Sequence, residues 1–230
     1  ADAPAPGSLS GVRSSFIRSG AALGIAAVAA AYAVVFRPLL CSWGATDAEN
    51  AAAYPGDDLI EGAERTPVMA TTLEAPPELV WPWLAQMGAD RAGFYSWDRL
   101  DNGGRPSATA LDPEWTEIRT GDRILSAPDG GHWFDVELAE PPHELILRAP
   151  IVLPSGRMFD PSRERPKAFV DGTWAFHLRE LPGDRTRLLV GGVGMLKPKL
   201  PNQIVSWLVM EPVHWFMQVK QFRELRRRAE

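Results

Sequence analysis

Apolar residues form one long uninterrupted stretch near the start of the chain. The 18 residues between Arg18 and Arg37 carry no charge. A helix of that length spans about 27 Å, close to the roughly 30 Å core of a bilayer. We therefore expect a single membrane-spanning helix over residues 16–40, which Pro38 helps to end. A signal peptide and a buried helix of a soluble protein are the alternative interpretations.

Small residues follow one side of this expected helix. Gly20 and Gly24 form a GxxxG pair, and Ala27 continues the same stripe. In lipid such a stripe allows close packing against a second copy or another membrane protein, although an alanine-rich helix also produces the pattern by chance. Two arginines precede the segment and one follows it, so the positive-inside rule slightly favours a domain outside the cytoplasm.

The rest of the chain changes to short alternating segments separated by turn signals. We expect a flexible N-terminus over residues 1–15, a linker over 41–65 and a folded domain over 66–230. Strands and helices are expected in that domain in the following order: a strand at 67–75, a helix at 75–88 bent by Pro82, a second short helix at about 94–100, strands at 122–126, 133–140, 144–149, 169–180 and 185–195, and a helical region at 202–230 split by Pro212.

The strand expected at 169–180 shows which faces the sheet presents. Trp174 and Phe176 alternate with neighbours that include His177, which predicts one apolar face and places His177 on the solvent side. An antiparallel sheet curved around the long C-terminal helix fits the element order, and such a sheet tends to leave an apolar cavity. The stretch 153–166 lacks periodicity and is expected to be a long loop, which makes it a candidate cover for that cavity.

Composition and charge narrow the classes of function. The net charge is −5, from 24 basic and 29 acidic residues, which disfavours a nucleic-acid partner. The single cysteine, Cys41, permits neither an internal disulfide nor a cysteine-based zinc site. No histidine pair has the spacing of a non-haem iron site, and no glycine-rich phosphate loop precedes a helix. The sequence therefore predicts no metal and no cofactor.

Several segments in order resemble one superfamily. APPELVWPWLAQMGADRAGFYSWDRLDN, TWAFHLREL, TRLLV and EPVHWFMQVKQFRELRRRAE resemble SRPBCC proteins, also called START-like or polyketide cyclase/dehydrase-like. Residues 37–60 look like the linker of a membrane-anchored actinobacterial-type subgroup. The resemblance implies an α+β helix-grip fold with a cavity for a hydrophobic ligand. It does not choose among lipid carriers, hormone binders, cyclases and oxygenase domains.

Aromatic residues supply the candidate ligand-binding positions. By the resemblance, the segment from Phe94 to Asp98 lies at the cavity mouth, and aromatic walls with few polar groups suit an amphipathic ligand. Packing in the core is the alternative for most of these side chains. The full set of candidates is Trp83, Phe94, Tyr95, Trp97, Asp98, Trp174, Phe176 and Phe216. No spacing marks an acid–base pair, so no residue is assigned a catalytic role.

These observations predict a membrane-anchored domain that binds a hydrophobic or lipid-like small molecule without catalysis. Two other functions remain open at this point. One is an accessory or structural subunit of a larger membrane complex, docked through the helix at 16–40. The other is a polyketide cyclase-type enzyme.

Overall fold

The computed structural model describes residues 30–230, and the chain forms two compact units, Ala1–Leu39 and Leu40–Glu230. In the first unit the described residues form a π-helix, η1 (Tyr32–Phe36), and the start of helix α2 (Arg37–Cys41). Most of the helix expected over 16–40, including Gly20, Gly24 and Ala27, lies outside the described residues. Among the residues that are described, no helix is both long and apolar enough to cross a bilayer.

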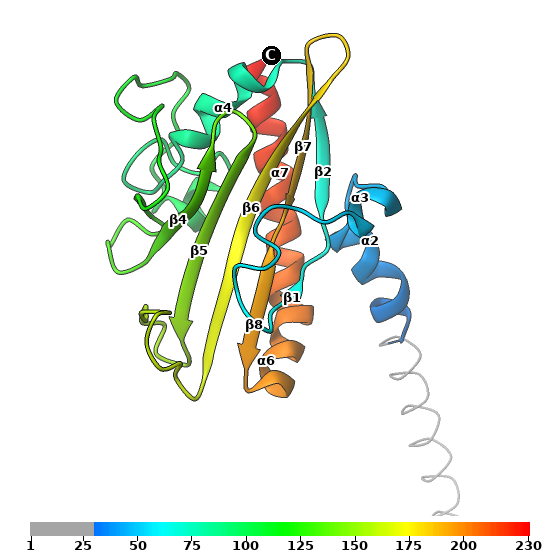
Figure 1. Ribbon diagram of the computed structural model, residues 1–230, viewed down its shortest axis with the longest axis vertical. Helices are drawn as coiled ribbons and strands as arrows, with labels where there is room; N and C mark the ends of the chain where they lie inside the picture. Colours follow the sequence, from blue (N-terminus) through cyan, green and yellow to red (C-terminus); the bar gives the residue numbers. More distant parts are fainter. Residues whose placement is uncertain (1–29) are drawn as a thin grey trace, which may run out of the picture. The chain divides into compact units, whose positions relative to one another are not determined.

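The second unit is an α+β domain with an open antiparallel sheet and a long C-terminal helix (Figure 1). This is the coarse fold class that the sequence predicts. Its elements, in chain order, are α3 (Asp47–Ala51), β1 (Glu64–Arg65), β2 (Met69–Leu73), α4 (Pro77–Ala85), α5 (Asp98–Asp101), β3 (Arg123–Leu125), β4 (Trp133–Glu140), β5 (Glu144–Val152), β6 (Phe169–Leu181), β7 (Arg185–Gly191), β8 (Val193–Lys197), α6 (Lys199–Val205), η2 (Ser206–Met210) and α7 (Glu211–Ala229).

The sheet is organised around its longest strand, β6. The first residues of β6 pair with β8 and its later residues pair with β7, so β7 and β8 act as two halves of one bent strand. Gly192 stands between these halves at φ +149°. The strand order is β1–β8–β6–β5–β4–β3, with β2 alongside β7. Every pairing is antiparallel, as expected for strands joined by short turns.

The inner face of the sheet is the one that packs against α7 (Figure 1). Trp174, Phe176 and Leu178 of β6 belong to this face, as their alternation in the sequence predicts. From α7 the buried side chains are Gln218, Val219, Gln221, Phe222 and Leu225. They recur at the three- and four-residue spacing of one helix face, which is the pattern of a helix lying on a sheet.

The C-terminal helical region is not split at Pro212. The chain keeps right-handed helical dihedral angles through Val205, Met210 and Glu211, and a π-helical turn, η2, lies just before the proline. A wider turn at this point relieves the clash between the proline ring and the preceding turn. The expected break at Pro212 is therefore wrong, because the helix adapts its hydrogen-bond pattern instead of ending.

Residues 41–65, which we call the outer-face segment, begin beside α7, where Trp43 stacks on Phe222, and then cross to the side of the sheet opposite α7. Helix α3 begins with a capping box between Thr46 and Glu49. Glu49 also binds the Arg187 guanidinium through both oxygens, at 2.7 and 2.8 Å, and this contact lowers the Glu49 pKa to about 2. Along the edge of β2 the Ala70 amide donates to the Trp43 carbonyl at 2.9 Å. The segment thus belongs to the folded unit and is attached to it by polar and aromatic contacts.

His177 lies beneath this segment. The Tyr54 ring stacks on the imidazole with centroids 4.6 Å apart, and only 2% of His177 is exposed. Its Nδ1 contacts the Glu144 carboxylate, which also pairs with Arg179. The expected solvent-side position of His177 is therefore wrong. Alternation correctly placed the side chain on the outer face, but it gave no sign that a distant segment covers that face.

The stretch 153–166 contains neither helix nor strand, as expected. Arg165 of this loop donates to the Glu61 carbonyl at 3.4 Å, which connects the loop to the outer-face segment. His132 contacts the Gly156 carbonyl at 2.7 Å and ties the loop to the start of β4. These contacts give the loop a position on the side of the sheet away from α7.

Candidate functional site

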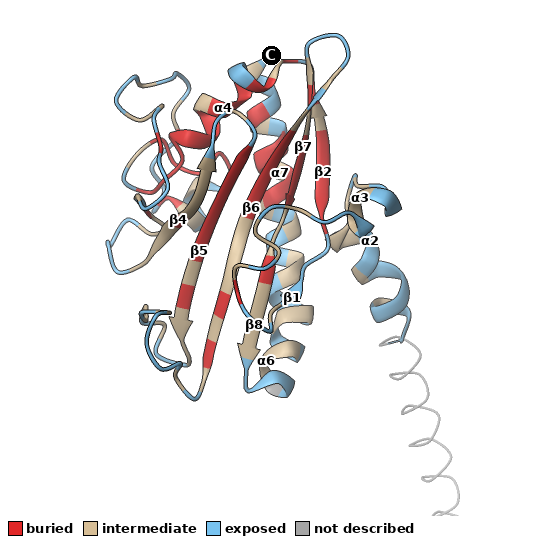
Figure 2. Ribbon diagram, viewed as in Figure 1, coloured by how far each residue is buried: buried red, intermediate tan, exposed pale blue. Residues whose placement is uncertain are grey.

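The inner face of the sheet is closed at one end and open at the other (Figure 2). Toward the C-terminal half of α7 its side chains are fully buried, as at Leu147, Phe176 and Leu188. Toward α6 the inner-face side chains remain partly exposed. This open half of the inner face comprises Phe134, Ala149, Ile151, Val170, Trp174 and Leu196. The molecule therefore leaves apolar surface accessible to solvent where a hydrophobic compound has room to contact it.

An aromatic cluster separates the two halves. Trp174 lies 4.7 Å from Phe176, 5.8 Å from Phe134 and 6.1 Å from Phe94, measured between ring centroids. Phe94 meets Phe134 edge to face at 6.3 Å. Rings at such distances and tilts attract one another and also present a continuous apolar wall. Three of the predicted candidates, Phe94, Trp174 and Phe176, are thus brought together here, and Phe134 joins them.

A chain of buried polar groups runs from this cluster into α7. The Trp174 indole donates from Nε1 to Gln218 Oε1 at 3.3 Å, and Gln218 Nε2 donates to Gln221 Oε1 at 2.8 Å. Gln221 Nε2 then donates to the Phe94 carbonyl at 2.9 Å. Both glutamines are almost completely buried. Buried polar groups need such partners, so the chain fixes the rotamers of the wall.

Sequence reasoning did not single out Gln218 and Gln221. The available signal was their three-residue spacing, which places both on the same side of a helix as Val219, Phe222 and Leu225. Two uncharged amides on an otherwise apolar helix face indicate that the interior of the domain supplies hydrogen-bond partners for them.

Trp97 and Phe216 meet at the surface between α5 and α7. Their rings stack with centroids 4.6 Å apart and an interplanar angle of 6°. The Trp97 indole donates to the Phe216 carbonyl at 3.4 Å, and the neighbouring Ser96 hydroxyl donates to the Met217 carbonyl at 3.2 Å. The stacking and these hydrogen bonds attach the α5 region to α7. Both rings are still partly exposed, so the pair also presents apolar surface to solvent.

Trp83 and Tyr95 form a separate buried pair. Their rings meet edge to face at 6.0 Å, and the Tyr95 hydroxyl accepts from Gln86 Nε2 at 2.8 Å. Arg228 lies over the Tyr95 ring at 4.8 Å. Burial raises the pKa of Tyr95, so the phenol stays protonated. These contacts describe a well-packed part of the core.

Asp98 is occupied by its own loop. Its Oδ1 accepts from the Ser107 hydroxyl at 2.6 Å and from the Ser107 amide at 3.1 Å. Ser107 Oγ also accepts a hydrogen bond from the Tyr95 backbone amide at 3.1 Å. The Asp98 carboxylate therefore positions Ser107, and Ser107 holds the loop after α5 against Tyr95.

Asp101 is a buried titratable group of this region that lacks hydrogen-bond partners among the described residues. Both of its carboxylate oxygens are buried, and neither makes a hydrogen bond of normal geometry with a described residue. Burial, followed by the nearby negative charge of Asp98, raises the pKa of Asp101 to about 6. A carboxyl group whose pKa is higher in the folded state destabilises the fold as the pH rises through the interval between the two pKa values.

We expect Asp101→Asn to stabilise the domain near neutral pH. The penalty in the native protein begins above pH 4 and is complete above about pH 6, because the unfolded carboxyl has its ordinary pKa of 3.8. Since Asp101 is only half-buried, solvent reduces the effect, and we expect a gain of about 1–2 kcal/mol. Urea unfolding of both proteins at pH 7.5 and pH 4.5 measures it. A gain that is equal at the two pH values would contradict the electrostatic explanation.

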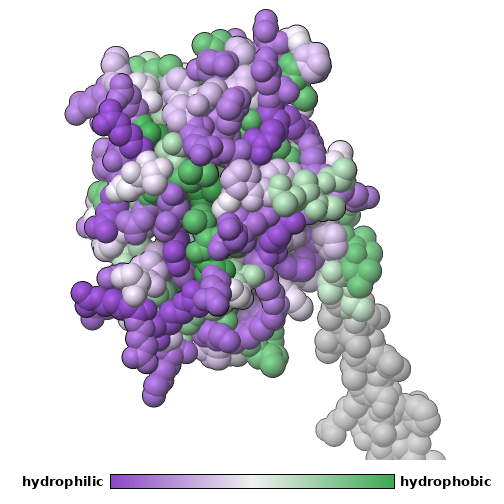
Figure 3. Space-filling model, viewed as in Figure 1, coloured by the Kyte–Doolittle hydropathy of each residue, from purple (hydrophilic) through white to green (hydrophobic). Residues whose placement is uncertain are grey.

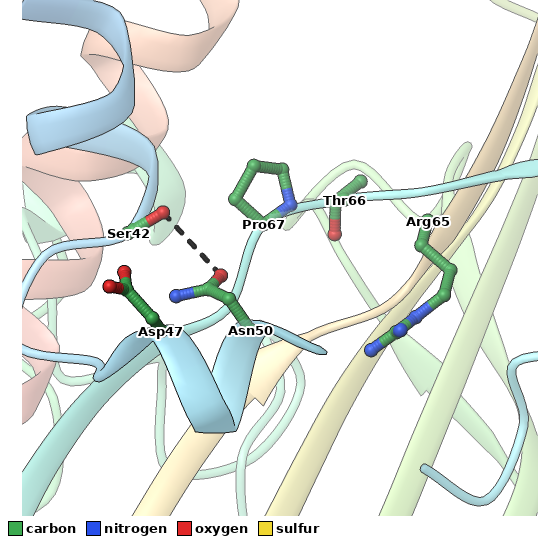
Figure 4. Close-up of a pocket in the computed structure, with 6 residues that line it drawn as sticks. All are labelled: Ser42, Asp47, Asn50, Arg65, Thr66 and Pro67. Carbon is green, nitrogen blue, oxygen red and sulfur yellow. Dashed lines mark hydrogen bonds between the residues drawn. The ribbon is translucent and has the colours of Figure 1, made fainter. Parts of the chain in front are cut away.

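The outer face has a polar hollow beside α3 (Figure 4). It is lined by Ser42, Asp47, Asn50, Arg65, Thr66 and Pro67. The side-chain oxygen Oδ1 of Asn50 accepts hydrogen bonds from the Val68 amide at 2.9 Å and from the Ser42 hydroxyl at 3.4 Å. These bonds join α3 to the start of β2, so Asn50 serves to attach the outer-face segment. Among the residues that the structure describes, no group of His, Cys, Asp and Glu side chains is arranged to hold a metal ion.

Comparison with known proteins assigns neither a family nor a function to this chain. No family model and no curated protein matches the sequence. Solved structures that align with it include protein Ms6760 from Mycobacterium smegmatis, with 14% identity over 70% of this chain and 87% of that one and a TM-score of 0.41. CalU16 from Micromonospora echinospora aligns with 17% identity over 73% and 84% of the two chains, with a TM-score of 0.35. An HSP90 activator from Plasmodium falciparum aligns with 13% identity over 64% and 91%, with a TM-score of 0.33. All three scores lie below 0.5, so we draw nothing further from these alignments.

Proposed function

We propose that this protein is a helix-grip domain of the SRPBCC type that binds a hydrophobic or lipid-like small molecule on the open half of the inner face. The binding is noncatalytic, and residues 16–40 tether the domain to a membrane. The observation that carries this proposal is the partly exposed aromatic wall around Trp174, which lies between the sheet and α7.

The wall has the properties of a binding surface for an amphipathic molecule. Its rings are held in place by the bonds from Trp174 through Gln218 to Gln221, so little side-chain freedom is lost when a ligand binds. The Trp174 indole and the Gln218 amide also supply polar atoms beside apolar surface. Few polar groups among many apolar ones is the usual composition of sites for such ligands.

The sequence resemblance and the topology support the SRPBCC assignment together. The motifs quoted above fall on α4, α5, β6, β7 and α7, which are the elements that form the inner side of the domain. An antiparallel sheet covered on its inner face by the C-terminal helix is the arrangement that the resemblance implies. The proposal remains noncatalytic because Asp98, the carboxylate among the candidate site residues, is engaged with Ser107.

A binding assay tests the function. The probe is a fluorescent polyene fatty acid, titrated into the full-length chain in detergent micelles or nanodiscs. We expect saturable binding, and we expect Trp174→Leu to weaken it about tenfold, because loss of one aromatic wall removes about 1.4 kcal/mol of contact. Native mass spectrometry of the chain extracted gently from its own membrane shows whether a small molecule remains bound.

Trp133→Leu is the matched control. Trp133 is also a half-buried tryptophan in a sheet strand, β4, but it stacks under Arg123 at 4.6 Å on the outer face. It should bind the probe as the native chain does. Equal losses in the two variants, or no saturable binding to the native chain, would contradict the proposal. Release together with other membrane subunits and without a small molecule would favour the accessory-subunit function instead.

A further inference from the structure

The N-terminal part of the C-terminal helical region exposes a continuous apolar stripe. Residues 200–210 contain no charged side chain. Large apolar side chains recur every three to five residues from α6 through η2 into α7, each between 42% and 76% exposed. We name this set the apolar stripe: Leu200, Ile204, Val205, Leu208, Val209, Val213 and Phe216. The hydrophobic surface at the end of the molecule formed by α6 is visible in Figure 3.

The stripe is on the wrong side of the helix to belong to the core. In α7 the core-facing positions are Gln218, Val219, Gln221, Phe222 and Leu225, and all of them are buried. A helix on the surface of a globular domain ordinarily presents charged and polar residues to water on its free side. Here the free side is apolar over about four turns of helix, which marks an interaction surface.

The surroundings of the stripe match those of a helix that lies in a lipid interface. Lys197 and Lys199 are exposed just before it, and Lys220 and Arg223 follow it. Half-buried tryptophans stand at 207 and 215. Basic residues at the ends, an apolar face between them and tryptophans beside it are the features of interfacial helices. The stripe also continues sideways, because Phe216 stacks on Trp97 and Leu100 is 64% exposed.

The residue that directly follows the expected membrane segment contacts this same helix. Residues 16–40 form the apolar stretch, and the next residue is Cys41. The Cys41 thiol donates to the Glu211 carboxylate at 3.2 Å, at the junction of η2 and α7 in the middle of the stripe's length. If the expected segment leaves the bilayer at residue 40, Cys41 and the helix that it contacts lie close to the bilayer surface.

We propose that the apolar stripe lies in the surface of a lipid bilayer, with its side chains inserted at the boundary between head groups and acyl chains. This places Trp97 and Phe216 at the lipid surface, next to the open half of the inner face. It goes beyond the proposed binding function by naming the bilayer as the docking partner and as the source from which a hydrophobic ligand reaches the aromatic wall. The docking does not depend on that binding.

Depth-dependent quenching in vesicles tests the proposal. The chain has one cysteine, so Cys41→Ser, which keeps a hydroxyl donor for Glu211, gives a background for single labels. A small fluorophore is attached at Leu208→Cys or, in a second variant, at Ile204→Cys. The full-length protein is reconstituted in phosphatidylcholine vesicles containing phosphatidylglycerol and brominated acyl chains. We expect the fluorescence at both positions to fall by about half or more, as for a side chain inserted about 5–10 Å below the surface.

Glu140→Cys provides the matched control. Glu140 is the exposed last residue of β4, just before the turn to β5, at the closed end of the sheet. A label there should show no quenching by brominated lipid and full quenching by aqueous iodide. Absence of lipid quenching at 204 and 208 would overturn the proposal, and so would protection of those labels from iodide without lipid quenching, which indicates a protein partner or a second copy. Fatty-acid binding is measured on the same samples. Loss of binding with quenching intact would refute the proposed function alone, and the reverse would refute only the docking.

Discussion

Asp171→Ala is expected to destabilise the domain by about 3 kcal/mol, because it leaves the Arg148 guanidinium buried without its main partner. Asp171 is completely buried on the outer face, and Arg148 is 9% exposed. The guanidinium donates to both carboxylate oxygens, at 2.9 and 2.7 Å. Glu137, at 3.4 Å, remains as a weaker partner, which is why we expect the lower end of the usual range for a broken buried pair.

Urea unfolding of the full-length chain, followed by circular dichroism, measures this loss. Glu117→Ala is the control, because it removes a carboxylate from an ion pair with Arg119 in which both side chains are more than three-quarters exposed. We expect it to change stability by less than about 0.5 kcal/mol. The double variant Arg148→Met with Asp171→Leu should recover most of the loss, because it removes both buried charges. If Asp171→Ala and Glu117→Ala behave alike, the pair on the outer face does not stabilise the domain as described.

Gly192→Ala should cost about 2–3 kcal/mol, since it combines backbone strain with a collision. Gly192 has φ +149°, a conformation that residues with a Cβ rarely adopt. A Cβ at this position would approach the Thr173 carbonyl oxygen to 2.4 Å and the Thr173 hydroxyl oxygen to 2.7 Å. Thr173 cannot withdraw, because it lies in β6 and its hydroxyl accepts from the Val193 amide at 2.9 Å.

Gly194→Ala is the matched control, two residues further along the same bent strand. Gly194 does not have a positive φ, and a Cβ there would meet no atom within 4 Å. Thermal unfolding should show a clear drop in Tm for Gly192→Ala and little change for Gly194→Ala. Equal drops would mean that loss of glycine in general, and not the bend between β7 and β8, is responsible.

The sequence predicts the inner side of this domain well. The alternation of Trp174, Phe176 and Leu178 in β6 assigns them to one face because the side-chain period of a strand is two residues. The turn signals locate most strands within a few residues. The position of α7 follows from its apolar spacing, and the order of elements then favours an antiparallel sheet with this helix on one face.

The outer side is hidden from the same reasoning. The outer-face segment has no periodicity, so nothing in its pattern shows that Tyr54 covers His177 or that Glu49 reaches Arg187 across 138 positions of sequence. Contacts of this kind depend on where the chain returns in space. For the same reason Trp97 and Phe216 were recognised as candidates one by one, but their stacking was not foreseen.

The candidate site divides in a similar way. Aromatic residues are conspicuous in a sequence, and five of those named as candidates form the wall and the surface pair. Asp98 has a local duty at Ser107, which no spacing rule distinguishes from a ligand contact. Gln218 and Gln221 are missed because glutamine is common on exposed helix faces, and only the packed structure shows that these two are buried.

The hydrogen bond between the Ala70 amide and the Trp43 carbonyl also protects the domain from self-association. It occupies a donor on the edge of β2 that would otherwise be available to a strand from another molecule. At the opposite edge of the sheet β3 is only three residues long, which offers little to pair with. A shorter chain beginning at Thr66 would lose Trp43, which stacks on Phe222, and would expose the β2 edge beside apolar Val68 and Leu189. We therefore expect that a shortened chain must begin no later than Leu40, well before the first long strand, to resist self-association.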